Sequence, residues 1–255
     1  MRRLSALMLI VVVAGLLAAV QPVRADALFE ARRDFWTGHQ PEHVAMGDFD
    51  EDGITDVAVA NGAGPSVSIL IGDGAGGFAE ATDYLVGVYP RAVAIGDFDE
   101  DGHQDVAIAD TDGSNVWLLL GDGGGAFSAA VGSGIGVTWP SFLAVGDFDE
   151  DGYDDLAVTS YYSFIGVSVA LGNGDGTFQT AVAHSTGEDA RHVAIADFNG
   201  DGHQDLAVTS FSSHSVSVFI GVGDGAFQGG VQYPTGDYPS SAAPGDFDED
   251  SHTDL

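Results

Sequence analysis

The sequence contains no cysteine and no lysine, and its seven basic residues are all arginine. The lack of cysteine excludes a disulfide scaffold, a zinc ribbon and thiol catalysis. Against these seven cations stand 39 Asp and Glu residues, which give a net charge of −32. Nucleic acids and anionic membrane surfaces are therefore poor partners for this chain, because both are recognised through basic protein surfaces.

Glycine is abundant, with 37 residues, and 45% of the chain is apolar. This apolar fraction is sufficient for a hydrophobic core, whereas disordered acidic tails are poor in apolar residues. We therefore expect a folded chain in spite of its high charge.

Residues 1–27 have the pattern of a secretory signal peptide. The basic start Met1-Arg2-Arg3 is followed by an apolar run over 4–20 and by small residues that allow cleavage after Ala25 or Ala27. The alternative is an uncleaved membrane anchor, because this run is close to the minimum length of a spanning helix. The pattern favours removal of the peptide and a secreted, periplasmic or cell-surface location, without membrane insertion of the mature chain.

One acidic nonapeptide recurs five times. It occupies residues 48–56, 97–105, 147–155, 197–205 and 246–254, so successive copies begin 49, 50, 50 and 49 residues apart. A glycine-rich marker lies between the copies at 72–78, 121–127, 172–178 and 221–227. Repeats of this length are typical of propellers and solenoids. The mature chain, 28–255, divides into repeat units near 29–77, 78–126, 127–177 and 178–226, with a partial unit at 227–255.

The segments between these markers are short and rich in β-branched residues, as in 93–95, 105–109, 115–120 and 78–84. Such runs, bounded by Gly, Asp and Asn, indicate strands because they are too short for helices. Four strands per repeat is the content of one propeller blade. The sequence therefore predicts an all-β fold, a β-propeller of four-stranded antiparallel blades, with about four complete blades plus partial ones.

Each nonapeptide places oxygen-bearing side chains at positions 1, 3, 5 and 9, and glycine at position 6 in four of the five copies. Calcium takes roughly six to eight oxygen ligands, and alternate Asp residues in a tight loop supply them. Position 7 would add its backbone carbonyl. The predicted side-chain ligands are Asp48, Asp50, Asp52, Asp56, Asp97, Asp99, Asp101, Asp105, Asp147, Asp149, Asp151, Asp155, Asp197, Asn199, Asp201, Asp205, Asp246, Asp248, Asp250 and Asp254. The predicted carbonyl ligands are Ile54, His103, Tyr153, His203 and His252.

The distribution of acidic residues supports a cation at these loops. The five nonapeptides hold 24 of the 39 acidic residues, and crowded carboxylates repel one another unless a cation lies between them. The alternatives are solvated acidic turns or the general surface acidity of a halophile, which would be spread evenly along the chain. An EF-hand is excluded because the twelfth-position Glu and the flanking helices are missing. We expect about four or five Ca²⁺ ions.

The pattern D-x-D-x-D-G-x-x-D resembles the FG-GAP or VCBS-type repeat, which also forms the calcium-loop blades of integrin α-subunit propellers. Three loops match it fully. The fourth has Asn199 and Gly200 in place of Asp-Glu, and the fifth has Ser251 in place of Gly, which puts closure of that loop in doubt. The position 2 residues are expected to pack between blades; they are Phe49, Phe98, Phe148, Phe198 and Phe247.

The resemblance also implies a blade number. Propellers of this family usually have seven or eight blades, so the chain is interpreted as a fragment of a larger ring. The strand count agrees with this interpretation. One isolated strand is expected at 29–36, and the first strand of a fifth, incomplete blade is expected just before the fifth acidic loop. The alternative is a ring completed by a second copy of the chain.

In an antiparallel meander, the first and third connections of each blade lie at one end and the others lie at the opposite end. The acidic and glycine loops therefore share one face, and aromatic side chains gather on the other. Such aromatics suit stacking on sugar rings or anchoring a protein partner, although they can also serve only to pack between blades. The ligand-face candidates are Trp36, Tyr89, Trp139, Tyr161, Tyr162, Phe211, His214 and Tyr238.

Catalysis has weaker support. The sequence has no Gly-x-Ser-x-Gly elbow and no His-Glu-x-x-His motif, and the predicted calcium loops account for most paired carboxylates. We interpret the chain as a secreted calcium-binding propeller that acts as a non-catalytic binding or adhesion module for an extracellular protein or glycan. The alternative is a carbohydrate-active protein, either a lectin or the propeller of a polysaccharide lyase.

Overall fold

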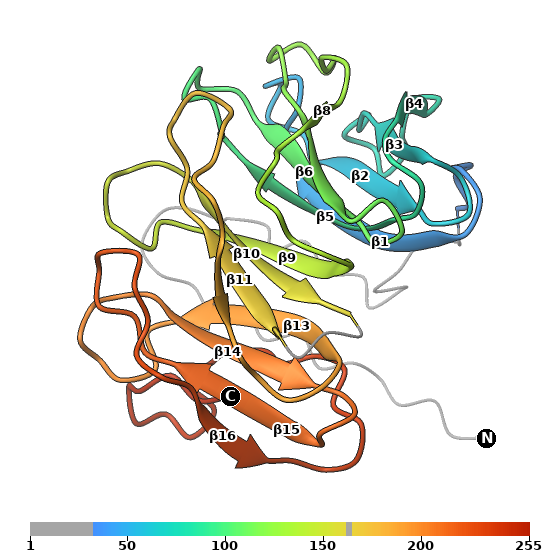
Figure 1. Ribbon diagram of the computed structural model, residues 1–255. Helices are drawn as coiled ribbons and strands as arrows, with labels where there is room; N and C mark the ends of the chain where they lie inside the picture. Colours follow the sequence, from blue (N-terminus) through green and yellow to red (C-terminus); the bar gives the residue numbers. More distant parts are fainter. Residues whose placement is uncertain (1–32, 162–164) are drawn as a thin grey trace, which may run out of the picture. The chain divides into compact units, whose positions relative to one another are not determined.

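The computed structural model describes residues 33–161 and 165–255 (Figure 1). The predicted signal peptide and the ligand-face candidate Tyr162 lie outside the described residues. The chain divides into two units, Met1–Asp34 and Phe35–Leu255. Only Arg33 and Asp34 of the first unit are described, and neither lies in a strand.

The described part of the second unit consists of strands and turns and contains no helix. Its strands form four sheets, each made of four consecutive antiparallel strands. Sheet 1 contains β1 (Pro41–Gly47), β2 (Asp56–Asn61), β3 (Ser66–Leu70) and β4 (Thr82–Leu85), and sheet 2 contains β5 (Pro90–Gly96), β6 (Asp105–Asp110), β7 (Asn115–Leu119) and β8 (Val131–Gly132). Sheet 3 contains β9 (Pro140–Gly146), β10 (Asp155–Ser160), β11 (Val167–Ala170) and β12 (Val182–His184), and sheet 4 contains β13 (Ala190–Ala196), β14 (Asp205–Ser210), β15 (Ser215–Phe219) and β16 (Val231–Pro234). The predicted all-β fold with four complete blades is confirmed.

The second strand of sheet 2 contributes to two hydrophobic cores at once. In β6, Val106 and Ile108 pack with residues of sheet 1, whereas Ala107 and Ala109 pack with residues of sheet 3. Successive side chains of a strand point to opposite faces, so β6 is buried along its whole length. The first strands of successive sheets lie side by side, β1 with β5, β5 with β9 and β9 with β13.

The phenylalanine at position 2 of the acidic loops joins successive sheets. Phe49 is 2% exposed and meets the edge of Phe127, from the glycine loop of the next sheet, with 5.3 Å between ring centroids. The contact recurs as Phe98 with Phe178 at 5.7 Å and as Phe148 with Phe227 at 5.6 Å. The predicted packing role is confirmed for these three residues. It is wrong for Phe247, which is 67% exposed.

Two predicted strands are absent from the described residues. Residues 33–36 carry no strand, and the segment before the fifth acidic loop forms only an isolated bridge between Gly245 and Asp254. Of the strand predicted at 29–36, residues 29–32 lie outside the described residues. A strand requires pairing along its length, and in the described part of the chain the segment before the fifth loop pairs only at Gly245. No helix long and apolar enough to cross a bilayer occurs in that part either.

Candidate metal centre and ligand face

The aspartate at position 9 of each of the first four acidic loops joins that loop to the glycine loop of the same sheet. Asp56 Oδ2 accepts the backbone N–H of Phe49 at 2.7 Å, and Asp56 Oδ1 accepts the N–H of Gly72 at 2.7 Å. Asp105, Asp155 and Asp205 repeat both hydrogen bonds in the following sheets. The acidic and glycine loops therefore lie at one end of each sheet, as the meander predicts.

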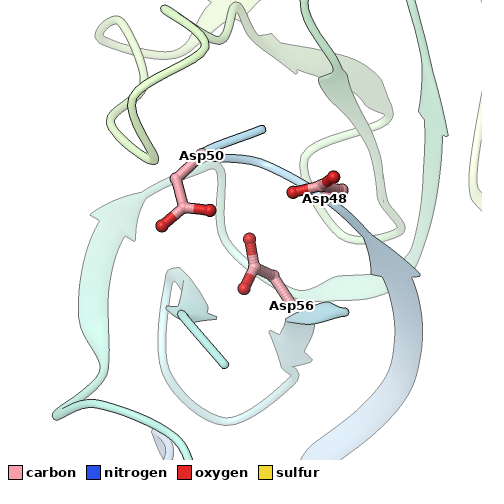
Figure 2. A group of neighbouring side chains, drawn as sticks. All are labelled: Asp48, Asp50 and Asp56. Atoms are coloured by element: carbon pink, nitrogen blue, oxygen red, sulfur yellow. The ribbon is translucent and has the colours of Figure 1, made fainter. Parts of the chain in front are cut away.

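Carboxylates of the first loop converge on one point. Figure 2 shows the side chains of Asp48, Asp50 and Asp56 turned toward one another, and each offers an oxygen within 4.8 Å of the others. Equivalent clusters are Asp97, Asp99 and Asp101; Asp147, Asp149 and Asp155; and Asp246, Asp248 and Asp250. The position 5 residues Asp52 and Asp151, which the sequence also predicts as ligands, lie outside these clusters.

Several oxygens in the first three loops have no hydrogen-bond partner although they are buried. They are Oδ1 of Asp48, Asp97, Asp99, Asp147 and Asp149. Burial followed by repulsion from Asp101 raises the pKa of Asp99, and Asp149 is raised in the same way by burial and by Asp151. A buried carboxylate oxygen without a donor is costly unless a cation faces it. These oxygens therefore fit a divalent cation, and oxygen-only ligands favour calcium.

The turn in each of these loops depends on left-handed backbone at two positions. Gly53, Gly102 and Gly152 at position 6 have φ between +83° and +93°. The preceding glutamates at position 4, Glu51 and Glu100, have φ of +57°, a region that favours glycine. The N–H of Gly53 then donates to Asp48 Oδ2 at 3.0 Å and closes the loop.

The fourth loop satisfies its own carboxylate. Asp197 Oδ1 accepts the backbone N–H groups of Asn199, Gly200 and Asp201, with the shortest bond, to Gly200, at 2.7 Å. The N–H of Gly202 and, after it, those of Gly200, Asn199 and Asp201 hold the pKa of Asp197 below its usual range. The Asn199 amide also donates to Asp201 Oδ2 at 2.8 Å. The fourth loop is therefore less dependent on a cation than the first three, because its carboxylate oxygens already have hydrogen-bond donors.

The fifth loop forms its carboxylate cluster at exposed residues. Ser251 takes the place of the position 6 glycine with φ of +71° and donates its N–H to Asp246 Oδ2 at 3.0 Å. The loop therefore closes, at the cost of a left-handed conformation for a non-glycine residue.

The predicted ligand-face residues lie around turns that meet at the other end of the sheets. In sheet 3 the N–H of Tyr161 donates to the carbonyl of Trp139 at 2.8 Å. Thr111 donates to Tyr89, and Phe211 to Asp189, in the same way. We call this end, formed by the turns after each second and fourth strand, the ligand face.

The aromatic side chains of the ligand face differ in exposure. Trp139 and Tyr238 are 48% and 57% exposed, whereas Tyr89, Tyr161, Phe211 and His214 are half-buried. Tyr238 contacts Phe211 and His214, with ring centroids 4.9 and 4.6 Å apart. Trp36 is 92% exposed and makes no ring contact with these residues in the described chain.

The sequence interpretation missed two residues of this face, Arg91 and Arg191. Their guanidinium groups lie over the ring of Tyr161. A signal was available, because no other Arg or Lys occurs between residues 35 and 255.

These features define a repeat protein of the β-propeller class, with carboxylate clusters at one end of its blades. A profile of the FG-GAP-like repeat matches residues 48–108, 97–158, 147–208 and 197–255. The chain belongs to the FG-GAP-like repeat family, as the acidic loops predict.

Solved structures with a similar fold include a lectin from Agrocybe aegerita, described as recognising non-reducing terminal N-acetylglucosamine. It is 23% identical over 73% of this chain and 50% of its own, with a TM-score of 0.52. Hydrazine synthase from Kuenenia stuttgartiensis is 16% identical over 82% of this chain and 53% of its own, with a TM-score of 0.55. The chain thus spans about half of each of these structures, and the likeness concerns the fold alone. No curated protein sequence matches the chain significantly.

Proposed function

We propose that the chain is an exported, calcium-binding propeller module that binds a glycan through its ligand face and is not a catalyst. Export is supported by the signal-peptide pattern of residues 1–27. Outside the cell calcium is plentiful, and an ion at each loop offsets the repulsion between carboxylates.

The observation that carries the calcium assignment is the set of buried, unpartnered carboxylate oxygens in the first three loops. Residues at position 1, 3, 5 or 9 would hold the ion, and it would neutralise two charges per loop. Calcium here takes the part that disulfides take in other exported proteins, because the chain has no cysteine.

The glycan assignment is supported by the aromatic side chains that remain exposed on the ligand face. Trp139 and Tyr238 both adopt left-handed backbone, with φ of +55° and +58°, which is unfavourable for bulky residues and is often maintained for function. Flat exposed rings suit stacking on sugars. The Agrocybe aegerita lectin adds support, since this protein of similar fold is described as recognising a sugar.

A thermal melt tests the calcium part. The purified chain is melted in chelator, in millimolar calcium and in millimolar magnesium. We expect a rise in melting temperature with calcium alone, because an ion bound only to the folded state stabilises it by about 2.7 kcal/mol per site at a hundredfold excess over Kd. A cooperative melt whose midpoint does not change with calcium would refute the metal assignment. A glycan array, probed in calcium, tests the glycan part, and the absence of any bound glycan would refute that assignment.

A further inference from the structure

The cations of the second unit meet at one aromatic ring. Arg91 and Arg191 are the only Arg or Lys residues between 35 and 255, and each is the second residue of the first strand of its sheet, β5 and β13. Their guanidinium carbons lie 4.9 and 4.7 Å from the ring centroid of Tyr161, which belongs to the intervening sheet 3. In a chain with a net charge of −32, this concentration of positive charge distinguishes the ligand face.

The two arginines are not equivalent. Arg191 donates from Nε and Nη2 to the two carboxylate oxygens of Asp189, at 3.2 and 3.0 Å, and it also lies over the ring of Phe211 at 4.0 Å. Its charge is therefore neutralised within the protein. Arg91 is only partly buried and forms no hydrogen bond or ion pair with any described residue.

The acids near Arg91 have other partners or remain apart from it. Glu42 and Asp112 act with Arg91 on the pKa of Tyr89, so all three lie near that side chain. Glu42 Oε1 accepts hydrogen bonds from the Tyr89 hydroxyl at 2.8 Å and from the Gln40 amide at 2.7 Å. The guanidinium of Arg91 is thus available to an external anion.

We propose that Arg91 binds the carboxylate of an acidic sugar, a uronic acid, whose ring stacks on the aromatic side chains of the ligand face. The inference rests on the proposed glycan-binding function and names its ligand class. A guanidinium holds a carboxylate through two parallel N–H···O bonds. Trp139 is linked to Tyr161 through the backbone beside this position and, at 48% exposed, offers aromatic surface.

The net charge limits the ligand further. Polyanions are repelled by a strongly negative protein, and one free cation matches one carboxylate. The site therefore suits a sugar with a single carboxylate, at a chain end, rather than a nucleic acid or a densely sulfated polymer.

The experiment measures binding of the full chain, in calcium, to three probes by titration calorimetry. The probes are glucuronate, glucose, which has the same ring without the carboxylate, and acetate, which has the carboxylate without the ring. Arg91→Gln removes the anchor. Gln228→Glu is the matched control, because it changes the net charge by the same amount at an exposed residue beyond the glycine loop of sheet 4.

We expect glucuronate to bind, with glucose and acetate each about tenfold weaker or more, because each lacks one half of the recognition. Arg91→Gln should lose about tenfold in glucuronate affinity, and Gln228→Glu should retain it. A thermal melt in calcium verifies that each variant folds. The comparison of the three probes on the unmodified chain tests the inference without any variant.

Three results would overturn the inference. Equal binding of glucose and glucuronate, unaffected by Arg91→Gln, would leave a glycan-binding module with a neutral ligand. Equal binding of acetate and glucuronate would reduce the site to an anion site. If glucuronate does not bind but a glycan array shows binding of neutral sugars, only the acidic-sugar inference is refuted. If no glycan on the array binds, the proposed glycan-binding function is refuted as well.

Discussion

Glu51 of the first acidic loop lies against His103 of the second, with 2.5 Å between Oε1 and Nδ1. Glu150 and His203 form the same pair between the third and fourth loops. The hydrogen bond to the glutamate raises the pKa of each histidine. The second and third loops lack the pair because Tyr153 takes the position of the histidine. Position 7 thus links successive blades through its side chain, in addition to the carbonyl role predicted for it.

The Glu–His pairs should contribute little to stability, because their side chains are one-third to one-half exposed. We expect Glu51→Gln to lower the melting temperature slightly at low salt and not at all in about 1 M NaCl, where charges are screened. Glu100→Gln is the matched control, since its counterpart in the next loop is Tyr153 and it should not lower the melting temperature at all. A large, salt-independent loss for Glu51→Gln would contradict the surface-pair interpretation.

Asp99→Asn should have opposite effects with and without calcium. In chelator the variant should melt higher than the parent, because it removes a buried carboxylate oxygen that has no partner. In calcium it should melt lower, because the second loop loses the stabilisation of its ion, about 2.7 kcal/mol at a hundredfold excess over Kd. Thermal melts of both proteins in both conditions test this, and an equal shift in the two conditions would count against a metal at this loop.

Asp197→Asn should behave differently from Asp99→Asn. The Asp197 carboxylate already receives backbone N–H groups of its own loop, so the neutral amide should weaken those bonds whether or not calcium is present. We expect a lower melting temperature in chelator as well as in calcium. A higher melting temperature in chelator would show that the carboxylates of the fourth loop lack hydrogen-bond donors to the same extent as those of the first three loops.

Val44 and Val93 occupy the same place in β1 and β5, yet Val44 is 56% exposed and Val93 is 1% exposed. Val93→Ala should reduce the free energy of unfolding by roughly 2 kcal/mol, because it leaves a cavity between sheets 1 and 2. Val44→Ala should change it by less than about 0.5 kcal/mol. Denaturant titrations in calcium measure both, and equal losses would mean that Val44 is covered in solution.

His43 and His192 both pack against Phe142, with ring centroids 5.3 and 4.4 Å from its own. Burial lowers the pKa of both histidines below 6.5. The folded state therefore favours their neutral forms. This contribution to stability is complete above the unfolded pKa and is lost as the pH falls from there through the lower folded pKa.

The expected outcome is a loss of stability between about pH 7.5 and 5.5 that is smaller in the double variant His43→Gln/His192→Gln than in the parent. Burial raises the pKa of Asp105 and Asp155 to about 6, which acts in the opposite direction but equally in both proteins. Chemical denaturation across this range provides the comparison, and parallel curves would refute the assignment.

Much of the fold could be predicted because its determinants are local. Alternating β-branched residues, acidic loops and glycine turns recur in every repeat, so four sheets and the pairing of loops at one end followed from the spacing. The last strand before Gly245 was predicted wrongly, because that segment forms only an isolated bridge. Of the strand predicted at 29–36, only residues 33–36 are described, and they carry no strand. Asn199 indicated that the fourth loop differs from the other acidic loops, but its hydrogen bonds to Asp201 could not be predicted from the sequence.

The sequence by itself determined the blades, because each acidic loop, its position 2 phenylalanine and its flanking strands lie within one repeat. Only the tertiary structure decided which carboxylate oxygens remain without a donor. Asp97 and Asp197 occupy the same position, yet Oδ1 of Asp97 has no partner whereas Oδ1 of Asp197 accepts the N–H of Gly200. It also decided that Arg91 and Arg191, in sheets 2 and 4, share the ring of Tyr161. Contacts of this kind depend on how whole sheets pack against each other. No local sequence pattern encodes the distance between residues of different sheets.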